Sequence, residues 1–335
     1  MRLATLPGAT PDGRLVVVTT DLSHAVDAAH IAPTLQAALD AWDEVSPRIS
    51  ALASALQQGT APGAFRFDQT AALAPLPRAW QWLDGSVFES HGRLMAQVFG
   101  IEDPPRTKPL MYQGMSHRFL SPSEPVPFRA EEDGIDFEGE FAVITDSVPM
   151  GVSPEKAMVH IKLIAQLNDW SLRTLAPTEM KTGFGWIQAK PACSMAPVVV
   201  TPDELGDAWR DGQVALKLRV DWNGERFGEP SGDAMGFNFA DLIVHAAGTR
   251  ELCAGTIIGS GTVSNDNFRE VGSTCIAERR GIEILDHGAP HTSFMKFGDR
   301  IRMEAFDSQG RSVFGAIDQA TVQSNSEPKR RHSTD

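Results

Sequence analysis

Two glutamates in the middle of the chain, Glu138 and Glu140, are the residues whose type and spacing best suit chemistry. The stretch 134–144 around them alternates with a period of two, which predicts a β-strand. On such a strand both carboxylates share one face with Asp136, at a spacing of roughly 7 Å, and apolar residues follow on that face. Burial of neighbouring like charges is costly unless a proton or a cation, typically a hard divalent ion, removes the repulsion. The alternative is an acidic strand edge that faces solvent.

Two aspartates elsewhere in the chain are candidate partners for this pair. Asp169 follows the apolar segment 164–168, where an acid bordered by large apolar residues must find a partner. A helix C-terminus or an ion pair with Arg173 would satisfy it as well as a metal ion. Asp84, which precedes Gly85, is equally consistent with a residue of a turn.

Several common catalytic motifs are absent from the sequence. The chain has no Walker A sequence, no His-Glu-x-x-His and no Gly-x-Ser-x-Gly. The stretch 259–262, Gly-Ser-Gly-Thr, lacks the third glycine of a dinucleotide-binding fingerprint and is more typical of a tight turn. Cys193, Cys253 and Cys275 have no Cys-x-x-Cys spacing, which argues against a disulfide framework or a thiolate zinc site. We expect reduced thiols, most of them buried.

Composition and charge narrow the class of protein. With 335 residues, of which 42% are hydrophobic, the chain can bury a sizeable core. The formal net charge of −13 gives no electrostatic footprint for nucleic acid or an anionic membrane. No apolar run approaches the roughly 18 residues of a membrane span, and residues 1–8 lack the apolar region of a signal peptide. We therefore expect a cytoplasmic protein that binds neither nucleic acid nor membranes.

Capping signals and periodicity predict the elements around these residues. One helix is predicted from about Thr34, and a second begins after a cap at Ser46 with Pro47 at its first position. A third helix is predicted after a cap at Ser153 and carries the chain to Asp169. The other predicted elements are a strand at 15–19, a loop over 97–126, hairpins at 223–224 and 307–310, a helix over 239–250 and a buried strand over 254–263.

Strands outnumber helices after about residue 75, which predicts a β-rich α+β fold with a closed or rolled mixed sheet. A doubly wound sheet would need a helix between most strands. The segment 58–77 is rich in Ala, Pro and Gly and marks a candidate domain boundary. We divide the chain into a small N-terminal α/β domain (1–72), a catalytic domain (73–323) and a polar tail (324–335) predicted to be disordered.

Spaced motifs over about residues 75–320 resemble the fumarylacetoacetate hydrolase family, nearer its two-domain fumarylacetoacetase and acylpyruvate hydrolase type. The motifs are Glu138-Gly139-Glu140, the segment Asn168–Arg173, Lys190, the segment Ser260–Ser264 and the segment Phe297–Glu304. The resemblance implies a β-roll, a homodimer and a divalent metal ion, Mg2+ or Ca2+, with Mn2+ as a further option. The implied metal ligands are Asp84, Glu138, Glu140 and Asp169.

The resemblance also implies roles for other residues. His91 lies seven residues after Asp84, as the catalytic histidine does in the fumarylacetoacetase branch, and Glu278 is its implied acidic partner. Lys190 matches a lysine that stabilises negative charge. The implied substrate-binding residues are Tyr112, Arg173, Gly261 and Thr262. By local sequence alone, His91 is equally explained as a surface histidine, Lys190 as a solvated lysine and Tyr112 as a packed aromatic. Arg173 could equally form an ion pair, and Gly261 and Thr262 could equally belong to a turn.

The activity that the resemblance implies is metal-dependent hydrolysis of a carbon–carbon bond in a 2,4-dioxo acid of the fumarylacetoacetate or acylpyruvate type. The metal ion would stabilise an enolate and His91 would activate water, in a pathway of aromatic catabolism. One alternative is a 2-oxo acid decarboxylase, hydratase or isomerase of the same fold, with His117 or a metal-bound water as the base. Another is a metal-stabilised binding protein without turnover.

Overall fold

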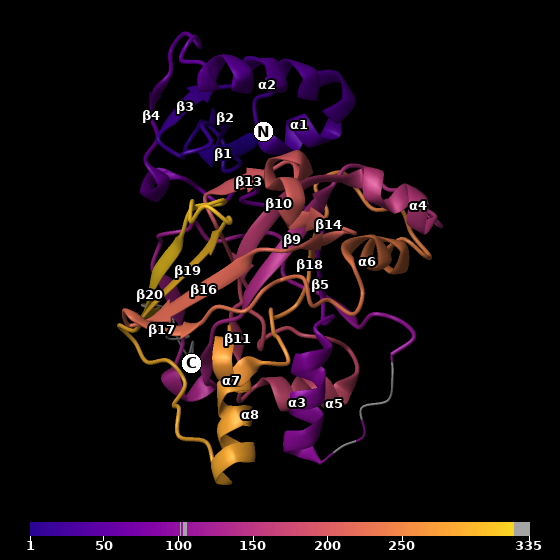
Figure 1. The fold of residues 1–335 in the computed structure, drawn as a ribbon, viewed down its shortest axis with the longest axis vertical. Helices are drawn as coiled ribbons and strands as arrows, with labels where there is room; N and C mark the ends of the chain where they lie inside the picture. Colours follow the sequence, from indigo (N-terminus) through magenta and orange to yellow (C-terminus); the bar gives the residue numbers. More distant parts are fainter. Residues whose placement is uncertain (101, 103–105, 325–335) are drawn as a thin grey trace, which may run out of the picture.

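The computed structural model describes residues 1–100, 102 and 106–324. Except for Ser324, the predicted tail lies outside these residues. Within them the chain has an α+β fold that is rich in strands, as the sequence predicts, with a large sheet of eleven strands and a second sheet of five (Figure 1). No helix in the described part of the chain is long and apolar enough to cross a membrane.

The large sheet runs in the order β4-β3-β2-β1-β13-β10-β9-β18-β5-β6, with β12 paired to β10. Its ladders are antiparallel except for the parallel pair β18 and β5. Its strands are β1 (Arg2–Leu6), β2 (Arg14–Val18), β3 (His24–Asp27), β4 (Phe65–Arg66), β5 (Trp82–Gly85), β6 (Met111–Gln113), β9 (Gly139–Thr145), β10 (Ile161–Asn168), β12 (Ser194–Met195), β13 (Val198–Val200) and β18 (Ile257–Gly259). The sheet therefore combines the N-terminal strands β1 to β4 with strands that lie between residues 82 and 259.

The second sheet runs in the order β17-β16-β19-β20-β7. Its strands are β7 (Val126–Phe128), β16 (Lys217–Trp222), β17 (Glu225–Gly228), β19 (Arg300–Phe306) and β20 (Ile317–Gln323). The predicted turn at 223–224 joins β16 to β17. Two short pairs complete the strands: β8 (Ile135–Asp136) with β11 (Ser171–Leu172), and β14 (Trp209–Arg210) with β15 (Gln213–Val214).

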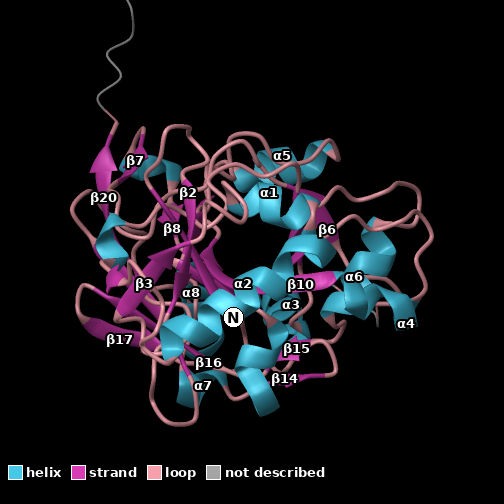
Figure 2. Cartoon of the chain, turned by 90° about the horizontal axis from the view of Figure 1, so that it is seen from above, coloured by secondary structure: helices cyan, strands magenta, loops and turns pink. Residues whose placement is uncertain are grey.

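The helices gather at the two ends of the molecule and along one side (Figure 1). Helices α1 and α2 lie over the N-terminal strands, as the view from above also shows (Figure 2). The helices are α1 (Leu35–Asp40), α2 (Trp42–Gln57), α3 (Glu89–Phe99), α4 (Pro154–Ala157), α5 (Ala176–Thr182), α6 (Phe239–Ala246), α7 (Phe268–Val271) and α8 (Ile276–His287), with 3-10 turns η1 (Gln69–Ala71), η2 (Glu131–Asp133), η3 (Met158–His160) and η4 (Pro202–Ala208). Helices α3 and α8 pack against each other at the end opposite α1 and α2.

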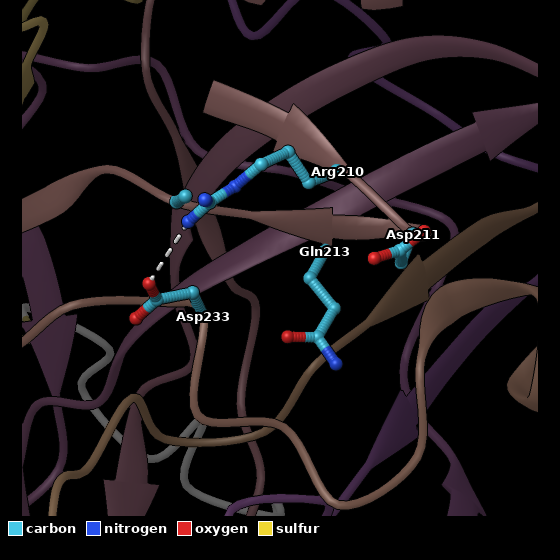
Figure 3. A pocket seen from close by; sticks show the side chains of 5 residues that line it. Arg210, Asp211, Gln213 and Asp233 are labelled. Atoms are coloured by element: carbon cyan, nitrogen blue, oxygen red, sulfur yellow. Dashed lines mark hydrogen bonds and ion pairs between the residues drawn. The ribbon is translucent and has the colours of Figure 1, made fainter. Parts of the chain in front are cut away.

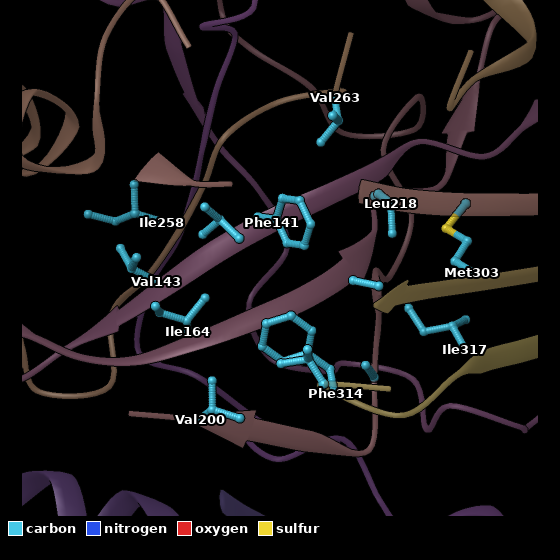
Figure 4. Packing of buried hydrophobic residues seen from close by; sticks show 14 of the residues in the cluster. Phe141, Val143, Ile164, Val200, Leu218, Ile258, Val263, Met303, Phe314 and Ile317 are labelled. Atoms are coloured by element: carbon cyan, nitrogen blue, oxygen red, sulfur yellow. The ribbon is translucent and has the colours of Figure 1, made fainter. Parts of the chain in front are cut away.

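Both faces of the large sheet are buried. On one face, apolar side chains of β9, β10 and β13 pack against those of the second sheet (Figure 4). On the other face, Ala142 and Ile144 of β9 belong to a cluster that includes Leu35 and Ile49 from α1 and α2. Burial of this much apolar surface is the main stabilising contribution to the fold, at about 25 cal/mol per Å2. A polar side chain on the central strands must therefore find a polar partner or an ion.

The strand predicted over 134–144 is interrupted. Strand β8 ends at Asp136 and pairs with β11, whereas β9 begins at Gly139 and pairs with β10. The break falls at Phe137 and Glu138, and the Glu138 N–H donates to the Asn168 side chain at 2.8 Å rather than to a backbone carbonyl. Asp136 therefore lies on a different strand from Glu140, although both share the predicted face.

Two predicted helices are wrong in their bounds. The helix after Ser153 ends at Ala157, and the residues from Ile161 form β10 instead. Strand β10 is buried on both faces, so its apolar residues do not alternate and match a helical period equally well. Helix α2 begins at Trp42 and contains Pro47, so Ser46 is not its cap. Packing of Val45 and Ile49 outweighs the roughly 3 kcal/mol cost of an internal proline.

The remaining predicted elements agree better with the structure. Thr34 caps α1, and α6 covers the first part of the helix predicted over 239–250. Strand β18 is shorter than predicted, at Ile257–Gly259. The region predicted as a loop over 97–126 contains β6, which carries Tyr112. All three cysteines are free; Cys193 and Cys275 are buried and Cys253 is exposed.

Candidate metal centre

Three carboxylates meet where four neighbouring strands of the large sheet come together. Asp84 lies on β5 and Glu140 on β9, and Asp169 directly follows β10. Strand β18 runs between β5 and β9 and places Gly259 opposite Asp84. One oxygen from each carboxylate lies within 4.8 Å of the other two, and all three side chains are buried. We call Asp84, Glu140 and Asp169 the carboxylate cluster.

Gly259 leaves room between these carboxylates. A Cβ atom at this position would lie 2.4 Å from Asp84 Oδ1 and 3.0 Å from Glu140 Oε2. The same Cβ atom would lie 2.4 Å from the Trp82 ring, so a larger residue would displace the tryptophan as well as the carboxylates. The sheet thus keeps a gap at the place where a cation would bind.

Glu140 is a buried acid that lacks a hydrogen-bond donor among the described residues. Its side chain is fully buried, and neither carboxylate oxygen accepts a hydrogen bond from the described part of the chain. Burial, followed by the Asp84 carboxylate, raises the pKa of Glu140 well above its usual value. Burial, followed by Asp169, raises the pKa of Asp84 in the same way. Converging oxygen donors of this kind fit a hard divalent cation such as Mg2+, Ca2+ or Mn2+.

Asp169 is the most connected member of the cluster. Tyr112 donates to its Oδ2 at 2.6 Å, and Lys190 Nζ lies 2.5 Å from the same atom. The Cys193 thiol donates to Oδ1 at 3.0 Å. The register of β5 and β6, which places Tyr112 opposite Asp84, brings the tyrosine into reach. Asp169 is therefore held in one orientation from several sides.

Lys190 joins Glu138 to the cluster. Its Nζ lies 2.6 Å from Glu138 Oε1 as well as beside Asp169. Burial opposes the charge on Lys190, but Asp169 and Glu138 outweigh it and raise the pKa of the ammonium group. Burial also opposes ionisation of Glu138, yet Arg173 and Lys190 lower the pKa of that carboxyl. Glu138 is thus an ionised partner of Lys190, adjacent to the cluster.

Arg173 lies between two carboxylates. Its Nε is 2.8 Å from Asp136 Oδ2, and NH2 is 3.1 Å from Glu138 Oε1. Asp136 in turn accepts the N–H groups of Ile276 and Ala277, at 2.7 and 2.9 Å, at the beginning of α8. A carboxylate at a helix N-terminus is favoured by the unpaired N–H groups there. Asp136 therefore connects β8 to the N-terminus of α8 through hydrogen bonds.

His91 and Glu278 form a second group, which we call the histidine–glutamate pair. His91 lies in the first turn of α3 and Glu278 in the first turn of α8. The His91 Nδ1 atom is 3.7 Å from Glu278 Oε1. Glu278 is fully buried and accepts a hydrogen bond from Ser264, whose hydroxyl accepts one from Ser90 at 2.9 Å.

A small residue lets the two helices approach. A Cβ atom on Gly281 of α8 would lie 2.6 Å from the terminal methyl of Met95 on α3. The glycine therefore permits the close packing that brings His91 next to Glu278.

The segment 259–264 connects the carboxylate cluster with the histidine–glutamate pair. The Gly261 N–H donates to Asp84 Oδ1 at 3.1 Å, Thr262 donates to Glu138, and Ser264 donates to Glu278. Gly261 has φ +78°, and a Cβ there would lie 2.4 Å from the Gly85 carbonyl oxygen, so the conformation requires glycine. One short segment thus fixes how the two groups lie relative to each other.

Two regions of the chain match known protein families. Residues 81–322 match the family described as fumarylacetoacetate (FAA) hydrolase C-terminal, and residues 1–78 match fumarylacetoacetase N-terminal domain 2. The chain belongs to the fumarylacetoacetate hydrolase family. Members of this family are enzymes, and they include hydrolases, isomerases and tautomerases.

Individual relatives of the family are distant. The 2,4-didehydro-3-deoxy-L-rhamnonate hydrolase of Sphingomonas sp. (strain SKA58) is 26% identical over 51% of this chain and 61% of that protein. The mitochondrial oxaloacetate tautomerase of Xenopus laevis is 25% identical over 48% of this chain and 49% of that protein. The matches thus span about half to three fifths of these relatives.

Solved structures of the family share the fold over nearly the whole chain. The maleylpyruvate hydrolase of Sphingobium sp. SYK-6, in complex with manganese(II) and pyruvate, has a TM-score of 0.62 and 19% identity, and the match covers 97% of this chain and all of that one. That family member therefore binds a divalent metal ion together with a small 2-oxo acid.

The structure places every site residue that the sequence indicates around the two groups just described. Asp84, Glu140 and Asp169 lie together, and Glu138 reaches them through Lys190. The four residues predicted to bind substrate contact carboxylates here: they are Tyr112, Arg173, Gly261 and Thr262. The alternative base, His117, is exposed in the loop after β6.

Sequence reasoning missed several contacts to these residues. The Cys193 thiol donates to Asp169, the Ser171 hydroxyl donates to Glu138, and the Ser264 hydroxyl donates to Glu278. No local signal distinguishes these small residues from ordinary core positions. Ser171 and Ser264 do lie within the motifs that resemble the family, but those motifs assign them no contact.

A hollow elsewhere on the molecule has a different character (Figure 3). It lies beside the β14–β15 hairpin, measures about 150 Å3 and is lined by Arg210, Asp211, Gln213, Ala215 and Asp233. Arg210 and Asp233 form an ion pair at 3.5 Å. The hollow is smaller than the roughly 300 Å3 of a typical ligand pocket, and none of the predicted site residues lines it.

Proposed function

We propose that the chain is a metal-dependent hydrolase that cleaves a carbon–carbon bond in a 2,4-dioxo acid of the acylpyruvate or fumarylacetoacetate type. The observation that carries this proposal is the segment 259–264, which hydrogen-bonds to the carboxylate cluster at one end and to the histidine–glutamate pair at the other. A cation site and a proton acceptor held at a fixed relation are the two parts that such a hydrolysis needs.

Asp84, Glu140 and Asp169, with Glu138 alongside, would hold the metal ion. The ion, Mg2+, Ca2+ or Mn2+, would supply Lewis acidity that stabilises the enolate forming on the departing 2-oxo acid fragment. The buried carboxylates keep their relative positions because neighbouring strands carry them, so little reorganisation is needed on binding.

His91 acts as the general base in this proposal. Its imidazole takes a proton from water, and the resulting hydroxide adds to the carbonyl carbon of the acyl group. The bond to the enolate carbon then breaks, and the imidazolium returns its proton to that carbon, which gives pyruvate or a related 2-oxo acid and a carboxylic acid. Glu278 stabilises the imidazolium because it lies 3.7 Å from Nδ1 and is itself buried.

Lys190 and the substrate-side residues complete the reaction site. The Lys190 ammonium group holds negative charge that develops on the attacked carbonyl oxygen. Tyr112, Thr262 and Arg173 bind the carboxylate or carbonyl oxygens of the substrate and fix the angle of attack. On substrate binding they would exchange their present carboxylate partners for the substrate. We also propose that the active protein is a homodimer and that residues 1–72 form the small N-terminal domain.

A second candidate is tautomerisation, isomerisation, hydration or decarboxylation of a 2-oxo acid such as oxaloacetate. The similarity to an oxaloacetate tautomerase favours it, because the same enolate stabilisation serves these reactions. Hydrolysis differs from them in the need for a base that activates water, which His91 supplies in our proposal.

A panel assay tests the proposal. Acylpyruvates of increasing acyl length and oxaloacetate are followed by loss of the enol absorbance with Mg2+, Mn2+, Ca2+ or chelator, and the products are identified by mass. We expect metal-dependent formation of two acids from at least one acylpyruvate. Conversion of oxaloacetate alone, without cleavage of any acylpyruvate, would support the second candidate. No metal-dependent reaction with any member would contradict both.

A further inference from the structure

We propose that His91, Cys275 and Glu278 form a second metal site, selective for Zn2+, and that Zn2+ bound there inhibits the enzyme by occupying the base. Binding of Zn2+ is independent of the proposed hydrolysis. Inhibition by Zn2+ rests on the proposed hydrolysis, because such inhibition requires His91 to be the group that activates water.

The three side chains converge from two helices. One ligand atom of each, a ring nitrogen of His91, the Cys275 sulfur and a Glu278 oxygen, lies within 4.8 Å of the other two. Cys275 is the N-cap of α8, Glu278 lies in its first turn, and His91 comes from the facing helix α3. A shift of under about 1 Å brings such atoms to the separations of a zinc site with bonds of roughly 2.0–2.3 Å.

Two of these side chains have a buried polar atom that forms no hydrogen bond with the described residues. Neither His91 Nδ1 nor Glu278 Oε2 has a hydrogen-bond partner in the part of the chain that the structure describes, although both atoms are buried. Glu278 is fully buried, so an unpartnered oxygen there is costly. The Cys275 sulfur accepts the Glu278 N–H at 3.3 Å, which holds the sulfur beside the first turn of α8. These orphaned atoms indicate a ligand.

The donor set selects the metal. One nitrogen, one sulfur and one oxygen suit Zn2+, whereas the carboxylate cluster offers only oxygen and suits Mg2+ or Ca2+. A thiolate and a carboxylate together balance the +2 charge, so the loaded site is neutral in its buried surroundings. Three protein ligands leave the fourth tetrahedral position to water. The chain thus separates two kinds of metal ion between its two groups.

Cys275 keeps its proton until a metal ion arrives. Burial, followed by the Asp136 carboxylate, raises the pKa of this thiol, while Arg173 acts in the opposite direction. Zn2+ displaces the proton because a coordinated thiol is deprotonated. The spacing of cysteines in the sequence could not reveal this site, since its single thiol joins ligands from a distant helix.

The consequence for catalysis follows from the His91 lone pair. A histidine that coordinates Zn2+ cannot accept a proton from water, so Zn2+ would stop hydrolysis even when the carboxylate cluster holds Mg2+. A chelator that removes Zn2+ selectively would restore the rate.

Zn2+ titration of the Mg2+-saturated protein tests the inference. We expect wild type to bind one further Zn2+ per chain, with Mg2+ retained, and Co2+ in its place to give a thiolate-to-metal charge-transfer band. Cys275→Ser keeps a good helix cap but removes the soft ligand, so it should lose the band and weaken Zn2+ binding more than about tenfold. The matched control, Cys253→Ser, changes an exposed thiol and should behave as wild type.

Other outcomes would overturn the inference. The charge-transfer band could persist in Cys275→Ser and vanish in Cys193→Ser, which would place the soft metal beside Asp169 instead. Zn2+ could also bind only by displacing Mg2+, or inhibit wild type and Cys275→Ser at equal concentration. If Zn2+ binds as expected but no acylpyruvate is cleaved, the metal site stands and the proposed hydrolysis fails.

Discussion

The carboxylate cluster and the histidine–glutamate pair are positioned by different kinds of secondary structure. Strands of one sheet carry Asp84, Glu140 and Asp169, and the ladders between β5, β18, β9 and β10 fix their spacing. Helices α3 and α8 carry His91 and Glu278, and side-chain contacts fix theirs. In our proposal, metal binding belongs to the sheet and proton transfer to the helices.

If this division is correct, changes in one group should leave the other intact. The strongest test is Glu140→Gln, which removes a buried carboxyl group whose oxygens accept no hydrogen bond from the described residues. We expect loss of metal binding by calorimetry and loss of detectable turnover, because the cation loses a ligand at the centre of the cluster. Without metal, the variant should melt at a higher temperature than wild type, since a buried like charge is gone.

The matched control for Glu140→Gln is Glu225→Gln, an exposed glutamate on β17 that should change neither property. Metal-dependent turnover that survives in Glu140→Gln would place the metal elsewhere.

His91→Ala addresses the other group. We expect a loss of about 10²–10⁴-fold in turnover, the range for removal of a general base, with unchanged metal affinity. Turnover on acylpyruvates and metal titration are measured on the same preparation. His117→Ala, which removes an exposed histidine, serves as the control. Loss of metal binding in His91→Ala would break the division, and full activity would remove His91 from the mechanism.

Metal removal should destabilise the protein in a manner that depends on pH. The pKa values of Asp84 and Glu140 in the folded metal-free protein lie above their usual 3.8 and 4.5. The contribution of these two carboxyl groups to the free energy of unfolding is therefore fully present below the usual values of 3.8 and 4.5. It is lost as pH rises through the raised pKa values of the folded protein. An ion at about a hundred times its Kd adds about 2.7 kcal/mol. Unfolding curves with and without chelator should diverge as pH rises, and curves that converge would contradict the cluster.

Gly281→Ala is the mildest test. The added Cβ would meet the flexible end of Met95 and push α3 slightly away from α8. We expect turnover to fall by about tenfold or less, since His91 shifts against Glu278, while metal affinity stays at the wild-type value. Steady-state kinetics and metal titration check this. A change in metal affinity would show that the helices and the sheet are coupled.

The sequence predicts the chemistry of the site better than the contacts within it. Glu140 and Asp169 stand out as acids next to apolar residues, whereas Asp84 is indicated only by the family resemblance; the structure brings these three together. The role of Gly259 as a spacer could not be predicted, because it depends on the register of β18 between β5 and β9. The interruption at Glu138 depends on a side-chain bond from Asn168, thirty residues away.

The fold class follows from the excess of strands, but the type of individual elements does not always follow. Strand β10 was indistinguishable from a helix by periodicity because both of its faces are buried, so the period of two is hidden. Pro47 is a helix-start signal that fails inside α2, where burial of Val45 and Ile49 compensates for a lost hydrogen bond. In both cases tertiary packing outweighs local preference.

The position of β1 has a consequence for synthesis of the chain. Its residues 2–4 pair with β13 at 198–200, so one edge of β1 has no partner until the ribosome has made nearly two hundred residues. At 5–20 residues per second, this takes roughly 10–40 s. An unpaired edge invites association between nascent chains. Substitutions that weaken β13 should therefore lower the yield of folded protein more than the activity of each molecule that folds.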